Sequence, residues 1–155
     1  MSVAFRRESD EEHLEPKFEI PIPVGPNWVT ARGLALIGQR IAEIAARLAA
    51  LSDEAEIKSA KRDLRYWQTR EVTAQLVPVP SGKTVEIGTS VSFRLGGKTR
   101  SLSVVGDDEA DPAKGLVSFS APLSRALMGG EAGDVLEFGG VEDAIEVLGV
   151  GVIGA

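Results

Sequence analysis

Three carboxylates in the middle of the chain could contribute to chemistry that depends on a metal ion. They are Asp53, Glu54 and Glu56. Carboxylate oxygens are the ligands that a hard cation such as Mg²⁺ prefers in proteins. The same side chains would also stabilise the start of a helix, each by about 0.3–1 kcal/mol through the helix dipole. The residues alone leave both interpretations open.

Basic residues follow the acidic group at intervals of three and four, in a chain whose formal net charge is −6. Residues at this spacing lie on one side of a helix. One hypothesis is that this side contacts the phosphates of a nucleic-acid backbone. The alternative is a solvated face that is partly paired with Glu54 and Asp63. The basic residues concerned are Lys58, Lys61, Arg62 and Arg65.

A second acidic run could suggest a cation site near the middle of the C-terminal half. It lacks the spacing of an EF-hand loop and the terminal bidentate glutamate of that motif. We therefore predict a structural turn in which carboxylates accept hydrogen bonds from nearby groups. The run consists of Asp107, Asp108, Glu109 and Asp111.

Composition excludes several classes of site. The chain has 155 residues, of which 43% are apolar and 26% are charged, a balance typical of globular proteins. It has no cysteine, which excludes disulfides and thiolate metal sites. Because it has a single histidine, His13, we expect neither a His-based triad nor a metal site with several histidines. The acidic balance disfavours nonspecific binding to duplex DNA. Without a membrane-spanning apolar stretch, we expect a soluble, cytoplasmic protein that does not bind membranes.

These groups must be positioned by a helical hairpin, which we predict over residues 29–78. Thr30 is a favourable N-cap, and the stretch from Asp53 to Glu56 fits a capping box at the start of a second helix. Each arm has about 20–24 residues and is roughly 30–36 Å long. Apolar residues at heptad spacing form the face of the first arm: Leu34, Ile37, Ile41, Ile44, Leu48 and Leu51. On the second arm we expect Ile57, Leu64, Trp67 and Leu76 to be buried.

The hairpin is flanked by two segments of different character. Residues 1–28 are charged and then rich in proline, so we predict an extended, partly disordered arm. Residues 79–155 show the alternation of β-strands, with Gly96-Gly97 and Gly139-Gly140 as hairpin turns. A short helix capped by Ser120 follows the third strand. The predicted fold class is α+β, with an antiparallel helical hairpin followed by an antiparallel sheet that carries one short helix.

Several motifs of the C-terminal segment occur together and in order. They read V-G-D-D-E-A-D-P at 105–112, A-P-L-S-R-A-L-M-G at 121–129 and G-D at 133–134. This segment resembles the C-terminal, FKBP-like domain of the bacterial GreA/GreB transcript-cleavage factors. In the hairpin, V-T-A-R-G-L at 29–34 and L-S-D-E-A-E at 51–56 are similar to the helix start and the tip of that family.

The resemblance implies an accessory factor of RNA polymerase that is not itself an enzyme and binds no cofactor of its own. In that family the C-terminal domain docks at the secondary channel, and the hairpin enters the channel. Acidic tip residues help to hold the second catalytic Mg²⁺ of the polymerase, which hydrolyses its own backtracked RNA. Asp53, Glu54 and Glu56 would then lie near the metal, and the basic residues would face the nascent RNA. The implied docking residues are Pro122, Leu123, Arg125, Met128, Gly133 and Asp134, although Leu123 is also a candidate for the core.

The chain departs from the family pattern at the tip of the hairpin. Ala50 stands where the family has an aspartate, and Asp53 stands where it has a longer glutamate. The family also has about a dozen more residues in the ascending arm, which makes this hairpin roughly 15–20 Å shorter. We therefore expect a short-armed regulator, similar to the Rnk-type proteins, with weak or no stimulation of cleavage. The alternative is a cleavage-competent factor that uses Asp53 and Glu54.

Two other classes of function remain as alternatives. A prolyl isomerase would need an aromatic pocket built from Phe93, Phe119 and Phe138, which alternation favours as core residues instead. A dimeric interaction module could use the heptad face between two chains. Binding in the polymerase channel predicts a monomer.

Overall fold

The computed structural model describes residues 19–154 and divides them between two compact units. The first, the hairpin unit, comprises residues 19–24 and 38–72, and the second, the sheet unit, comprises residues 25–37 and 73–154. The interpretation of residues 1–18, including His13, lies outside the described residues. Each unit is described by itself below.

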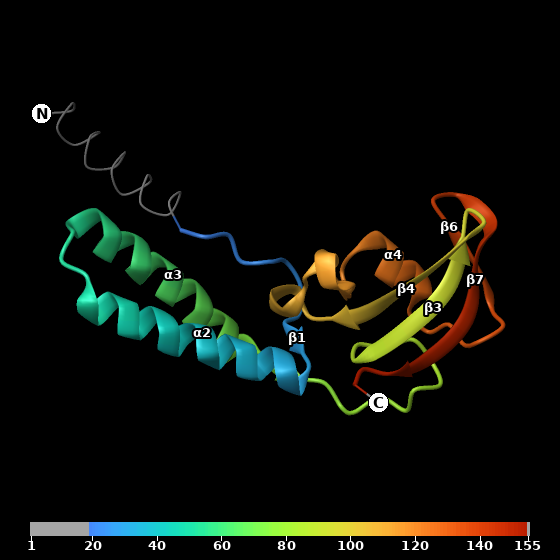
Figure 1. Ribbon diagram of the computed structural model, residues 1–155, viewed down its shortest axis with the longest axis horizontal. Helices are drawn as coiled ribbons and strands as arrows, with labels where there is room; N and C mark the ends of the chain where they lie inside the picture. Colours follow the sequence, from blue (N-terminus) through green and yellow to red (C-terminus); the bar gives the residue numbers. More distant parts are fainter. Residues whose placement is uncertain (1–18, 155) are drawn as a thin grey trace, which may run out of the picture. The chain divides into compact units, whose positions relative to one another are not determined.

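Two helices form the predicted helical hairpin (Figure 1). Helix α2 spans Ala31–Ala50 and helix α3 spans Glu54–Thr73. Thr30 caps α2, because the N–H of Gly33 donates to Thr30 Oγ1 at 3.0 Å. On the heptad face of α2, Ile37 and Ile44 are buried, and the other four residues are half-buried. The hairpin and its N-cap are therefore confirmed.

Helix α3 ends earlier than predicted, and Leu76 is not on its buried face. Strand β2 (Gln75–Leu76) follows the helix and pairs in parallel with strand β1 (Trp28–Val29). The N–H of Gln75 donates to Asn27 O at 2.8 Å, and that of Val77 donates to Val29 O at 2.9 Å. Because these two N–H groups donate to Asn27 and Val29, they are not available for the hydrogen bonds that would continue α3. Leu76 is consequently 58% exposed, and its predicted burial was wrong.

The other expectations for the inner face of α3 are met in part. Ile57, Leu64 and Trp67 are half-buried. The fully buried positions of this helix are instead Ala60 and Arg70.

The sheet unit contains a five-stranded sheet of order β5-β4-β3-β7-β6. Its strands are β3 (Thr89–Leu95), β4 (Lys98–Val105), β5 (Leu116–Ser118), β6 (Val135–Phe138) and β7 (Val141–Val152). Both two-glycine turns are confirmed, since Gly96, Gly97, Gly139 and Gly140 all have positive φ. This is the conformation that the tight turns of two-residue hairpins require.

One pair of strands corrects the prediction of a wholly antiparallel sheet. Strand β5 is parallel to β4, whereas the other three pairs are antiparallel. Two 3₁₀ turns, Asp107–Glu109 and Pro112–Lys114, lie between these strands and bring the chain back in its original direction. The sheet is therefore mixed, within the α+β class that was predicted.

One face of the sheet packs on a core that includes the short helix α4 (Pro122–Leu127). Ser120 does not cap this helix, because the N-cap residue is Ala121 and the hydroxyl of Ser120 donates to Asp107 Oδ1 at 3.0 Å. Phe93 is 1% exposed, and Phe119 and Phe138 pack against the same core. The three rings thus serve the core, as alternation favours, and this arrangement gives no support to a prolyl isomerase.

A buried carboxylate joins the start of α2 to the loop after β4 within the sheet unit. Glu109 Oε1 accepts a hydrogen bond from the hydroxyl of Thr30 at 2.5 Å, and Oε2 accepts one from Arg32 at 2.9 Å. The side chain of Glu109 is 4% exposed. A Cβ on Gly33 would lie 2.9 Å from Glu109 Oε1, so a larger residue at this position would have to displace the buried carboxylate. The motif at 29–34 therefore supplies the donors, and the motif at 105–112 the acceptor, of one buried contact.

The same junction contains a still closer approach, which leads to a prediction. A Cβ added to Gly106 would lie 2.4 Å from the carbonyl oxygen of Trp28, although the backbone of Gly106 is ordinary, with φ −75°. We expect Gly106→Ala to lower the free energy of unfolding by about 1–3 kcal/mol, the usual cost of overpacking. Urea denaturation measures this quantity.

Gly151→Ala is the matched control, because a Cβ there meets no atom within 4 Å and φ is not positive. It should leave the free energy of unfolding unchanged or raise it slightly. Equal losses in the two variants would contradict the close packing of β1 against Gly106.

Candidate functional site

The tip of the hairpin is a three-residue connection, residues 51–53, between α2 and α3. Asp53 begins α3: its Oδ2 accepts a hydrogen bond from the N–H of Glu56 at 3.0 Å, and its carbonyl oxygen accepts one from Ile57 at 2.9 Å. The predicted capping role of Asp53 is therefore confirmed. Asp53, Glu54 and Glu56 are all exposed at this end of the hairpin unit.

The tip does not assemble a metal site by itself. Among residues 19–154, no group of three or more acidic or histidine side chains could hold a metal ion. Ala50, the last residue of α2, contributes only a methyl group. One carboxylate oxygen of Asp53 is already used in capping. The tip thus presents exposed acidic groups but no preformed set of ligands.

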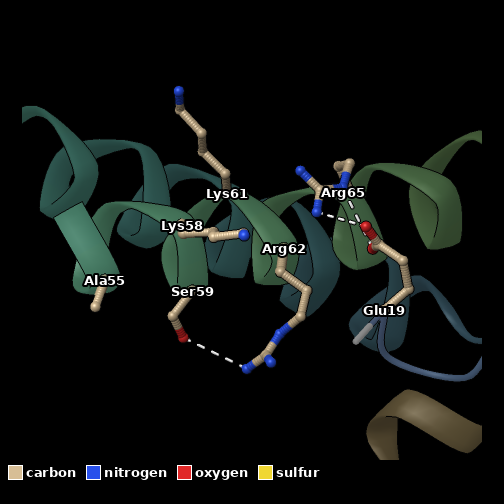
Figure 2. Close-up of a pocket in the computed structure, with 7 residues that line it drawn as sticks. All are labelled: Glu19, Ala55, Lys58, Ser59, Lys61, Arg62 and Arg65. Carbon is tan, nitrogen blue, oxygen red and sulfur yellow. Dashed lines mark hydrogen bonds and ion pairs between the residues drawn. The ribbon is translucent and has the colours of Figure 1, made fainter. Parts of the chain in front are cut away.

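The four basic residues line one open hollow on α3, of about 480 Å³ (Figure 2). Lys58, Lys61 and Arg65 are exposed, and Arg62 is half-buried. Within the described part of the chain, neither lysine has a carboxylate within 4.0 Å. The hollow therefore concentrates positive charge on the surface of an acidic protein. Its lining also includes Glu19, Ala55 and Ser59.

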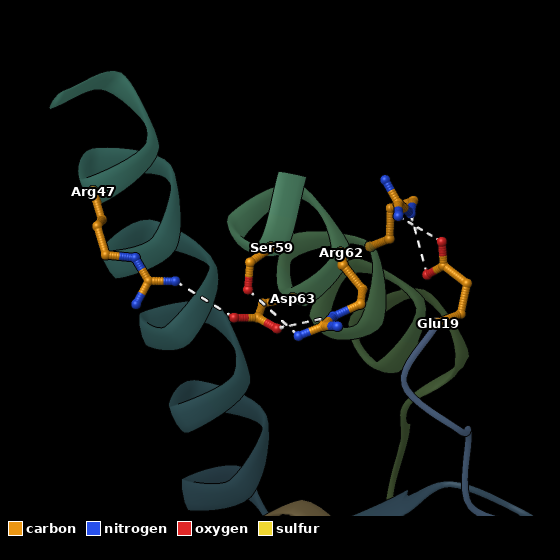
Figure 3. Close-up of polar contacts among 6 residues, drawn as sticks. Glu19, Arg47, Ser59, Arg62 and Asp63 are labelled. Atoms are coloured by element: carbon orange, nitrogen blue, oxygen red, sulfur yellow. Dashed lines mark hydrogen bonds and ion pairs between the residues drawn. The ribbon is translucent and has the colours of Figure 1, made fainter. Parts of the chain in front are cut away.

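Part of this basic surface is paired with acidic groups (Figure 3). Arg62 Nε lies 3.9 Å from Asp63 Oδ1, and the other oxygen of Asp63 lies 3.4 Å from Arg47 of α2. Arg62 also donates to the hydroxyl of Ser59 at 3.4 Å. The predicted pairing of the basic residues with Asp63 is present through Arg62, and the pair of Asp63 with Arg47 links the two helices.

Arg65 has a partner that the sequence analysis missed. Glu19 lies 46 positions earlier in the chain, and its two carboxylate oxygens accept hydrogen bonds from Arg65 Nε at 3.3 Å and from Nη2 at 2.5 Å. No periodicity or motif connects such distant residues. The only signal was the presence of a carboxylate close to the proline-rich segment of a chain with an exposed cationic helix.

The residues implied in docking gather around α4 and the turn before β6. Pro122, Arg125 and Met128 are exposed, whereas Leu123 is half-buried and packs against the core. Gly133 and Asp134 are exposed in the turn, where Asp134 Oδ2 accepts a hydrogen bond from the N–H of Glu131 at 2.9 Å. The structure brings these residues to the surface of the sheet unit, with Leu123 as the exception.

The acidic run at 107–111 is a structural turn, as predicted. Glu109 makes the buried contact with Thr30 and Arg32. Asp107 Oδ1 accepts hydrogen bonds from the hydroxyls of Ser118 and Ser120 at 2.5 and 3.0 Å. These carboxylates hold the loop after β4 in place.

Comparison with known proteins shows that the chain is similar to transcription elongation factors. Residues 80–150 match the family described as "Transcription elongation factor, GreA/GreB, C-term". A protein of Caulobacter sp. (strain K31), named transcription elongation factor GreA, is 39% identical over 116 residues, which cover 64% of this chain and 72% of the relative. GreA of Thermomicrobium roseum is 31% identical over 99 residues, with 62% of each chain covered.

Solved structures show a weaker likeness. GreA factor homolog 1 (Gfh1) of Thermus thermophilus is 19% identical, with 81% of this chain and 99% of that chain covered and a TM-score of 0.38. Among the described residues, no helix has the length and apolar character needed to cross a membrane.

The tip geometry predicts that Asp53 contributes to stability. Asp53→Ala removes the acceptor for the N–H of Glu56 and should lower the free energy of unfolding by about 0.5–2 kcal/mol. Asp53→Asn keeps a capping oxygen and should lower the free energy of unfolding by far less. Chemical denaturation of both variants measures the difference. An equal loss in the two variants would contradict a capping role for the side chain.

Proposed function

Because the chain belongs to the GreA/GreB family of transcription elongation factors, we propose that it binds RNA polymerase at the secondary channel and occupies that channel with little or no stimulation of transcript cleavage. In this proposal it is an accessory factor, and any hydrolysis of RNA is carried out by the polymerase. The observation that carries the proposal is a short hairpin whose tip lacks a set of metal ligands.

The docking part of the proposal is supported by the C-terminal match. Residues 80–150 include α4 and the turn before β6, where the implied docking residues are exposed. Arg125 and Met128 lie on α4 and at its end, beside a sheet that holds them on a rigid core. A site on such a scaffold loses little conformational entropy when it binds a partner.

The tip residues do not fit the role of a carboxylate pair that holds the second Mg²⁺ of the polymerase. Ala50 has no side-chain oxygen, and Asp53 is engaged in capping α3. Mg²⁺ binds carboxylate oxygens at about 2.0–2.1 Å and demands near-ideal geometry, so one displaced side chain cannot substitute for a positioned pair.

The length of the hairpin also disfavours a role of the tip in holding the second Mg²⁺ of the polymerase. Each helix has 20 residues, which corresponds to about 30 Å. The family resemblance places about a dozen more residues in the ascending arm, so this hairpin would reach roughly 15–20 Å less far.

The basic surface of α3 supports a contact with nascent RNA in the channel. Lys58, Lys61, Arg62 and Arg65 line one hollow, and arginine in particular binds phosphate through two parallel hydrogen bonds. Such contacts position the RNA backbone without reading its sequence. The occupant of the hollow in this proposal is the RNA phosphate backbone.

Transcript cleavage by backtracked elongation complexes of the cognate polymerase tests the proposal. We expect no more than a few-fold stimulation by the wild type, in a reaction where a cleavage-competent GreA serves as the positive control. The chain should nevertheless inhibit the GreA reaction by competing for the channel. Arg125→Glu should raise the concentration needed for half-maximal inhibition at least tenfold, because it reverses a charge on the docking surface. Glu137→Lys is the control, since it reverses an exposed charge on β6.

Two results would contradict parts of the proposal. Strong cleavage by the wild type that is lost in Asp53→Ala/Glu54→Ala would show that the short hairpin delivers its carboxylates, which is the alternative function. If the chain neither stimulates cleavage nor competes with GreA, the polymerase channel is not its site of action.

A further inference from the structure

The ion pair between Glu19 and Arg65 places a carboxylate of the chain itself in the basic hollow. Glu19 precedes a proline-rich segment, and Arg65 lies near the middle of α3; both belong to the hairpin unit. The pair has two hydrogen bonds, from Nε and Nη2 of the guanidinium to the two oxygens of the carboxylate. Figure 2 shows the carboxylate of Glu19 facing the guanidinium of Arg65.

This geometry is the one in which arginine also binds phosphate. The planar guanidinium offers two parallel N–H donors, which match two oxygens of either a carboxylate or a phosphate. Glu19 therefore occupies the donors that a phosphate of RNA would use. It also places a negative charge beside Lys58, Lys61 and Arg62 in the same hollow.

The pair is exposed enough to open. The side chain of Glu19 is 44% exposed and that of Arg65 is 54% exposed. Exposed ion pairs of this kind contribute little to stability, and salt in the solvent screens them further. A polyanion that makes several contacts in the hollow could consequently displace a single carboxylate.

The segment that carries Glu19 has a restricted backbone, which favours the contact of Glu19 with Arg65. Pro21, Pro23 and Pro26 follow within seven residues and restrict the backbone, which lowers the entropy lost when the segment is ordered. Ile20, next to Glu19, is half-buried.

We propose that Glu19 is an intramolecular competitor for RNA, which masks Arg65 in the free protein and is displaced when a phosphate backbone enters the basic hollow. The inference rests on the proposed RNA contact of that hollow. It adds a regulatory role for the segment before the hairpin, which would reduce binding to RNA outside the polymerase channel, where the local RNA concentration is low.

Binding of a fluorescein-labelled single-stranded oligouridine to the full chain, measured by fluorescence anisotropy at low ionic strength, tests the inference. Glu19→Gln removes the competing charge and should tighten binding about two- to sixfold, as expected when a weak exposed pair blocks the site for part of the time. Glu43→Gln is the matched control, because it removes one exposed charge from the same unit at an i,i+3 pair with Arg40. It should change the affinity by much less.

A double-mutant cycle separates the specific pair from the general change of charge. In an Arg65→Gln background, Glu19→Gln should have no larger effect than Glu43→Gln, because its partner is absent. A higher salt concentration should reduce the difference in RNA affinity between Glu19→Gln and the wild type. Arg65→Gln should bind RNA more weakly than the wild type.

The outcomes distinguish the inference from the function on which it rests. If Glu19→Gln and Glu43→Gln tighten binding equally while Arg65→Gln weakens it, the hollow binds RNA but Glu19 does not mask it, and the inference is overturned. If neither Arg65→Gln nor Lys61→Gln weakens binding, the hollow is not an RNA site, and both the inference and the proposed RNA contact are wrong.

Discussion

The buried carboxylate of Glu109 makes the contact on which the arrangement of the sheet unit depends. It accepts hydrogen bonds from Thr30 and Arg32, and Thr30 in turn caps the first turn of α2. A buried carboxylate without partners would cost several kcal/mol, so these donors have to be present whenever Glu109 is buried. The positive end of the α2 dipole adds a further favourable interaction with this charge. The start of the hairpin is thus fixed to the loop after β4, and Gly33 permits the close approach.

Because the first turn of α2 is held in place, the number of residues in the helix determines how far the tip lies from it. An α-helix advances 1.5 Å per residue, so the position of the tip along the helix axis depends on the number of residues after Thr30. With 20 residues in α2, the tip carries Asp53 and Glu54 about 30 Å from the start of the helix. The basic hollow lies behind the tip on α3, in the range from Lys58 to Arg65. In the proposed function the hairpin can therefore fill a channel and contact RNA while its carboxylates remain distant from the catalytic metal.

Local chemistry made a large part of this structure predictable from sequence. Thr30 and Asp53 as N-caps and the two Gly-Gly turns depend on residues a few positions apart, and all four were confirmed. The features that were missed depend on distant pairing. Leu76 leaves the helix because the N–H groups of Gln75 and Val77 donate to Asn27 and Val29, each 48 positions earlier. Strand β5 is parallel to β4 because the connection with two 3₁₀ turns returns the chain to its original direction, and the contact of Glu19 with Arg65 spans 46 positions.

The most direct test of the account is a structure of the full chain bound to a backtracked elongation complex of its polymerase. The distance to measure joins the carboxylate of Asp53 to the nearest catalytic Mg²⁺. We expect the hairpin to lie in the secondary channel and this distance to be roughly 15–20 Å, the length of the missing helical residues. A carboxylate oxygen of Asp53 or Glu54 at about 2.0–2.1 Å from the metal would contradict it, because the tip would then be a ligand of the catalytic ion.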